Sequence, residues 1–65
     1  MLNRKYSLKE LRARQNLTQE ETAKLLGISR RSYVKLEKEP MKVKYCTLLE
    51  VARILKVDIG EIDFR

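Results

Sequence analysis

Apolar side chains recur along this chain at intervals of three and four residues, a spacing that places them on one side of an α-helix. Five short patterns of this kind follow one another, headed by Leu8, Ala23, Tyr33, Leu48 and Ile59. No segment shows the strict apolar and polar alternation typical of a half-buried β-strand, and there is no internal repeat or low-complexity tract. The pattern predicts a compact all-α fold with five helices.

A recurrent residue pair marks the helix starts. A Ser, Thr or Asp followed three residues later by Glu can form a capping box, in which each side chain accepts a hydrogen bond from the backbone amide of the other residue. Four such pairs are present, namely Ser7 with Glu10, Thr18 with Glu21, Thr47 with Glu50, and Asp58 with Glu61. Ser29 supplies a further cap. We therefore expect helices to begin after residues 7, 18, 29, 47 and 58.

Two residues mark helix ends. Gly27 follows the second apolar pattern, where a left-handed backbone is needed and glycine adopts it without penalty. Pro40 ends the third helix and pushes Glu39 toward an extended conformation. Residues 41–45 then form a basic connector.

Residues 18–38 contain two helical patterns joined at one glycine, the arrangement of a helix-turn-helix. Ala23 occupies the position where the two helices must cross closely, and Gly27 occupies the turn. Counted from Gln19, the fourth, eighth, tenth, fifteenth and eighteenth positions should be apolar, and they are Thr22, Leu26, Ile28, Tyr33 and Leu36. The alternative is a generic helical hairpin, which does not require this spacing.

The third helix has two different faces. At about 100° per residue, Tyr33 and Leu36 share one side, and the opposite side carries Arg30, Arg31, Val34 and Lys35. Arginine can donate two hydrogen bonds to guanine, and the first residues of a recognition helix meet base edges in the major groove. The helix is therefore predicted to read DNA. Solvated surface charges are the alternative.

The composition fits one small domain, residues 1–65, with a strong positive charge. Fifteen Lys and Arg stand against nine Asp and Glu, giving a net charge of +6. The excess lies in residues 1–16 and 28–45, on either side of the second helix. Such a distribution suits a phosphate surface.

Other classes of function lack the residues they need. The chain has no histidine, and Cys46 is its single cysteine, so the usual metal ligands and catalytic bases are missing. We expect no enzyme activity, no cofactor and no small-molecule substrate. The apolar runs are too short for a signal peptide or a membrane span, and a cytoplasmic location is expected.

Four segments resemble the Cro and phage-repressor type of helix-turn-helix family: residues 8–12, 17–30, 33–37 and 48–57. The resemblance extends over about residues 8–62. It implies a five-helix repressor-like domain whose third helix enters the major groove of double-stranded DNA. Thr22 departs from the usual leucine, and the loop after Glu37 lacks the common Asn-Gly turn.

The resemblance also implies roles for individual residues. Arg30, Arg31 and Lys35 occupy base-reading positions, so each half-site should contain a guanine. Gln19 occupies the position of a phosphate-binding glutamine, and Arg12 and Glu37 occupy those of an ion pair between the first and third helices. Further candidates for phosphate contacts are polar or basic residues near this surface, namely Thr18, Ser32, Lys38, Lys42 and Lys44. Tyr33 is expected in the core rather than stacked on a base.

The sequence thus favours a sequence-specific transcriptional regulator, either a repressor or a Cro-like switch. The alternative is an antitoxin or protein-interaction module with the same fold, in which DNA binding is secondary. One recognition helix covers few base pairs, so a homodimer is expected. Its interface is predicted to contain Ile59, Ile62 and Phe64.

Overall fold

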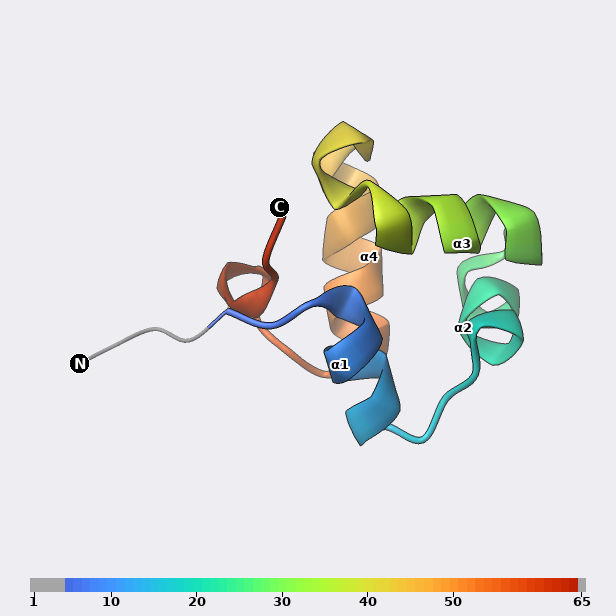
Figure 1. Ribbon diagram of the computed structural model, residues 1–65, viewed down its shortest axis with the longest axis horizontal. Helices are drawn as coiled ribbons and strands as arrows, with labels where there is room; N and C mark the ends of the chain where they lie inside the picture. Colours follow the sequence, from blue (N-terminus) through green and yellow to red (C-terminus); the bar gives the residue numbers. More distant parts are fainter. Residues whose placement is uncertain (1–4, 65) are drawn as a thin grey trace.

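A computed structural model describes residues 5–64, and within them the chain forms four α-helices and two short 3-10 turns (Figure 1). The elements in order are α1 (Leu8–Arg14), α2 (Gln19–Leu26), α3 (Arg30–Lys38), η1 (Pro40–Lys42), α4 (Tyr45–Leu55) and η2 (Ile59–Glu61). The all-α prediction is confirmed for these residues. The prediction of five helices is not confirmed, because the last segment forms only the single 3-10 turn η2.

Local caps begin the helices largely where the sequence predicts them. The Ser7 hydroxyl accepts a hydrogen bond from the Glu10 amide at 3.1 Å, and the Glu10 carboxylate accepts one from the Ser7 amide at 2.9 Å. Thr18 and Glu21 form the same reciprocal pair at the start of α2. Ser29 caps α3 by accepting a hydrogen bond from the Ser32 amide at 3.1 Å.

The predicted cap at Thr47 is wrong. α4 begins at Tyr45, with Lys44 as its extended N-cap residue, so Thr47 already lies in the first turn. The helix begins as soon as the chain has left η1, which ends at Lys42. Glu50 therefore has no cap to complete, and it accepts a hydrogen bond from Arg53 at 2.8 Å instead.

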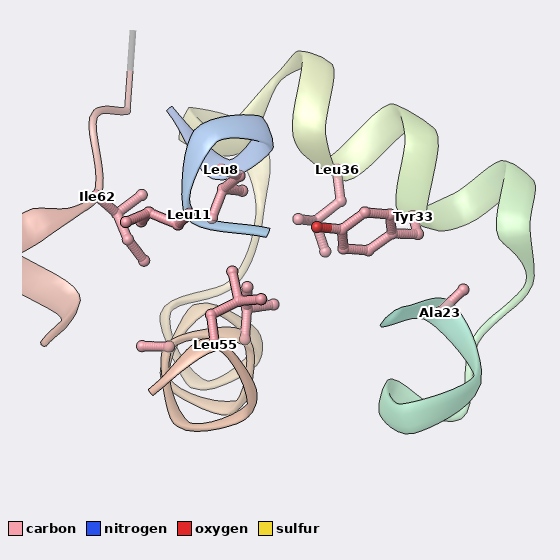
Figure 2. Close-up of a cluster of buried hydrophobic side chains, with 9 residues drawn as sticks. Leu8, Leu11, Ala23, Tyr33, Leu36, Leu55 and Ile62 are labelled. Carbon is pink, nitrogen blue, oxygen red and sulfur yellow. The ribbon is translucent and has the colours of Figure 1, made fainter. Parts of the chain in front are cut away.

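The core collects side chains from all four helices and from the residue after η2 (Figure 2). Tyr33 of α3 is fully buried, as are Leu11 of α1 and Leu55 of α4. Ala23 is buried where α2 packs against α3. Thr22 is also fully buried, and its hydroxyl donates to the Thr18 carbonyl at 2.9 Å, which satisfies a polar group at an apolar position.

The two ends of the described chain pair with each other. Tyr6 donates its amide to the Glu61 carbonyl at 2.7 Å, and the Asp63 amide donates to the Tyr6 carbonyl at 2.9 Å. This isolated parallel bridge draws Ile62 into the core, where it is completely buried, while Ile59 and Phe64 are partly buried against the same core. Assigning Ile62 to a dimer interface is therefore wrong, because its side chain is used within the chain.

Candidate nucleic-acid interface

A left-handed glycine fixes the angle between α2 and α3. Gly27 has φ 75° and ψ 27°, and it ends α2. Its amide donates to the Lys24 carbonyl at 3.1 Å, and the next amide, that of Ile28, donates to the Ala23 carbonyl at 3.0 Å. These bonds satisfy the last carbonyls of α2 and direct the chain into α3.

α3 presents a polar face opposite its buried one. Tyr33 and Leu36 are buried, whereas the side chains of Arg30, Arg31, Ser32, Lys35 and Lys38 are exposed. Val34 is half-buried at the edge of this face. In the described part of the chain, α3 thus carries four cationic side chains on the side away from the core, and its single carboxylate lies elsewhere.

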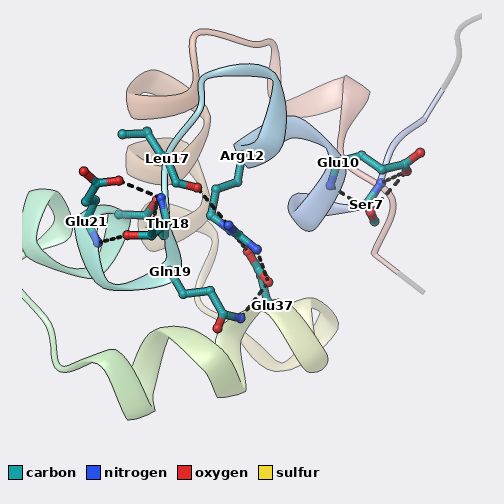
Figure 3. A network of polar contacts seen from close by, with 9 residues as sticks. Ser7, Glu10, Arg12, Leu17, Thr18, Gln19, Glu21 and Glu37 are labelled. Carbon is teal, nitrogen blue, oxygen red and sulfur yellow. Dashed lines mark hydrogen bonds and ion pairs between the residues drawn. The ribbon is translucent and has the colours of Figure 1, made fainter.

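That carboxylate, Glu37, anchors α3 to the first two helices (Figure 3). Arg12 of α1 donates from Nε to Glu37 Oε2 at 2.6 Å, and Gln19 of α2 donates from Nε2 to Glu37 Oε1 at 3.1 Å. Arg12 also donates from Nη1 to the Leu17 carbonyl at 2.8 Å. The network therefore joins three helices and the α1–α2 loop, and it fixes the position of α3.

The electrostatics of Glu37 follow from this contact set. Burial alone raises the pKa of Glu37, but the hydrogen bonds from Arg12 and Gln19 and the charge of Arg12 outweigh it and lower the pKa below its usual value. Glu37 is therefore ionised at neutral pH. The neighbouring hydroxyl of Tyr33 has its pKa raised, mainly by burial and next by the Glu37 carboxylate.

One flank of α3 adjoins the start of α2. Thr18, Gln19 and Arg30 line a shallow cleft together with Arg12 and Glu20. The first amides of a helix have no partner inside it, and the helix dipole adds a partial positive charge at this end. Arg30, Gln19 and Thr18 therefore lie together at this end of α2, in the same cleft as the Glu20 carboxylate. Gln19 also contacts Glu37, a hydrogen bond that the sequence pattern does not predict.

The other flank of α3 adjoins η1. A second cleft is lined by the polar residues Ser32, Lys35, Glu39 and Lys42 and by the apolar residues Ile28, Leu36 and Val43. Lys42 forms an exposed ion pair with Glu39 at 3.2 Å. Arg31, Val34, Lys38 and Lys44 line neither of these two clefts. The predicted DNA contacts are thus spread over the α2 start, the length of α3 and the η1 region.

A cation also lies outside this surface, in a contact that the sequence pattern does not predict. The Arg14 guanidinium lies 4.2 Å from the centroid of the Tyr6 ring. The basic charge of the N-terminal block is therefore partly used in packing against an aromatic ring.

Two features typical of other kinds of function are absent from the described residues. These residues contain no group of three or more His, Cys, Asp or Glu side chains that could hold a metal ion. None of the helices described is both long and apolar enough to cross a membrane.

Comparison with known proteins assigns the family. A family model described as helix-turn-helix matches residues 8–62, which is most of the chain. Searches among curated proteins and among solved structures find no significant match. The matching family is one of DNA-binding transcription regulators. The chain belongs to the helix-turn-helix family of the Cro and phage-repressor type.

Proposed function

We propose that this protein is a sequence-specific regulator of transcription that reads double-stranded DNA with α3. One observation supports this function above all others: the exposed cationic face of α3 is held opposite a buried face by the contacts of Glu37 with Arg12 and Gln19. A recognition helix needs this combination, because its exposed side chains must meet base edges at a fixed angle.

Within this proposal, the first turns of α3 read sequence. Arg30, Arg31 and Lys35 point hydrogen-bond donors away from the core, and Val34 at the edge offers a small apolar contact. Arginine bound to guanine O6 and N7 contributes about 1–3 kcal/mol of discrimination. We therefore propose that each half-site contains at least one guanine.

Phosphate contacts hold the domain in register on both sides of the groove. Thr18 and Gln19 serve one strand at the α2 start, where helix amides reinforce them. The remaining phosphate contacts are assigned to exposed residues on or beyond α3, namely Ser32, Lys38, Lys42 and Lys44. Such contacts fix position and carry no sequence information directly.

The biological output that we propose is repression or a Cro-like switch between two operators. A protein whose α3 occupies the major groove can block other proteins from the same site without a further domain. A single α3 spans few base pairs, so we propose that two chains bind half-sites about one DNA turn, or ~34 Å, apart.

Selection from a random duplex library tests the proposal directly. The purified chain should enrich a guanine-containing motif, and the double variant Arg30→Ala/Arg31→Ala should recover no motif while keeping its helical circular-dichroism signal. A wild-type chain that enriches nothing and binds no duplex would contradict the proposal. In that case the antitoxin or protein-interaction alternative becomes the better explanation.

A further inference from the structure

α4 has an exposed apolar side that the core does not use. Its inner side buries Leu48, Val51, Ala52 and Leu55. Tyr45 and Leu49 lie one helical turn apart on the outer side and are 64% and 44% exposed. Met41, in the adjoining turn η1, is 65% exposed. We call Met41, Tyr45 and Leu49 the α4 patch.

We propose that the α4 patch contacts the α4 patch of a second copy of this chain when both copies occupy neighbouring half-sites on DNA. The inference rests on the proposed function, and it replaces the interface expected around Ile62. It also makes the dimer dependent on DNA, for reasons of geometry, area and charge.

The geometry follows from the relative position of α3 and α4. In the view of Figure 1, α3 lies level with the N-terminal half of α4, η1 joins the two helices, and α4 continues past α3. The α4 patch is at the end nearest α3. A two-fold axis parallel to α4 and beside this patch keeps both copies of α3 at the same end of the pair, where one DNA duplex can reach both. A two-fold axis perpendicular to α4 would place the second α3 at the opposite end.

The area of the α4 patch decides how strong the contact can be. A large side chain offers about 200 Å² of surface, so the three exposed side chains provide roughly 300–400 Å² per copy. A stable interface buries about 800 Å² on each partner. The patch alone is therefore too small to hold a dimer in free solution, and too small for an unrelated partner that nothing else holds in place.

The positive charge around the patch also argues against a dimer in free solution. Lys42 and Lys44 lie between Met41 and Tyr45 in the sequence and are exposed, although Lys42 also pairs with Glu39. Each chain carries a net charge of +6. Two free copies therefore repel each other where the patches would meet. DNA phosphates neutralise these lysines, and adjacent half-sites hold the two patches at a high effective concentration. Both effects favour the second copy on DNA as the occupant of the patch.

The test compares duplexes that carry one or two copies of the half-site recovered by selection. Wild-type chain should sediment as a monomer without DNA, and it should bind the two-site duplex at least about tenfold more tightly per site than the one-site duplex. The double variant Tyr45→Gln/Leu49→Gln should lower this ratio to about one and leave binding to the one-site duplex unchanged. Leu25→Gln is the matched control, because Leu25 is 60% exposed on α2, outside the patch.

Cys46 gives an independent readout of the same contact. It is exposed next to Tyr45, and it is the single cysteine of the chain. A short bismaleimide should join two wild-type chains on the two-site duplex, and join none on the one-site duplex or without DNA.

Three results would overturn the inference: a wild-type ratio near one, a ratio that the double variant leaves unchanged, or a cross-link that forms without DNA. In the first two cases the α4 patch does not join two copies of the chain on DNA. Failure of the proposed function looks different, because the chain would then bind neither duplex.

Discussion

Arg12 and Glu37 are joined side chain to side chain at 2.6 Å, although 25 positions separate them in the sequence. Their side chains are only 13% and 8% exposed, so the pair is shielded from most of the solvent. The contact connects α1 to the last turns of α3. The orientation of the candidate recognition helix therefore depends on a charge pair outside the surface that would meet DNA.

Removing the carboxylate should destabilise the fold. In Glu37→Gln the Arg12 guanidinium keeps its bond to the Leu17 carbonyl but loses its charged partner, and we expect the free energy of unfolding to fall by about 2 kcal/mol. Urea denaturation followed by circular dichroism measures this change. Glu50→Gln is the control, since its ion pair with Arg53 is exposed and should contribute less than about 1 kcal/mol. Equal losses in the two variants would show that burial of the Arg12 pair has no energetic consequence.

Acid should remove the contribution of Glu37. Because its pKa is lowered in the folded chain, the ionised form stabilises the fold above about pH 4.5, and this stabilisation declines as the pH falls through the lowered pKa. Denaturation measured from about pH 7 to about pH 3 should show the difference between wild type and Glu37→Gln shrinking with acidity. Glu10 and Glu21 have pKa values lowered by their capping hydrogen bonds, so the variant keeps a weaker pH dependence. A difference that stays constant with pH would contradict this account.

Substitution of a base-reading residue should relax specificity. Arg31 is exposed in the first turn of α3, and Arg31→Ala is expected to lower discrimination at one base pair by about 1–3 kcal/mol. Competition binding with duplexes altered at single positions of the selected site measures the loss. An equal drop in affinity for every duplex would instead assign Arg31 to phosphate.

Substitution of a phosphate-binding residue should change how DNA affinity depends on salt concentration. Lys38 is exposed near the end of α3, and Lys38→Ala should weaken binding to all duplexes alike. The logarithm of wild-type affinity should fall linearly with the logarithm of salt concentration, with a slope of about −0.9 per neutralised phosphate, and the variant should reduce the slope by about 1. An unchanged slope would place Lys38 away from the DNA backbone.

Replacing the turn glycine should lower the stability of the fold because of its backbone conformation alone. A Cβ at Gly27 meets nothing within 4 Å, but the φ of 75° is unfavourable for other residues, so Gly27→Ala should cost about 1–2 kcal/mol of stability. Gly60→Ala is the matched control, because Gly60 also has free space and its φ lies outside the left-handed region. Thermal melting of both variants, with destabilisation confined to the first, measures the effect. Similar melting temperatures would mean that the backbone at Gly27 relaxes without cost.

The sequence by itself determined the local features of the helix-turn-helix. Four of these features can be predicted from the sequence: the caps at Ser7, Thr18 and Ser29 and the left-handed turn at Gly27. Each depends on hydrogen bonds or backbone angles within a few residues. The buried face of α3 is readable for a similar reason, since helical periodicity alone places Tyr33 and Leu36 together. The same local reading failed at Thr47, where the end of η1 rather than the best cap decides where the helix begins.

Only the tertiary structure decided what the remaining apolar residues do. Sequence periodicity shows that Ile62 and Tyr45 are apolar, but it does not show whether each meets the core of its own chain or the solvent. The bridge to Tyr6, 56 positions earlier, buries Ile62, while the packing of Leu48 and Val51 turns Tyr45 outward. The contact of Gln19 with Glu37 likewise could not be predicted from the sequence, because it depends on the crossing of α2 and α3. These contacts join segments that are distant along the chain, and only the folded arrangement of the helices brings them within reach.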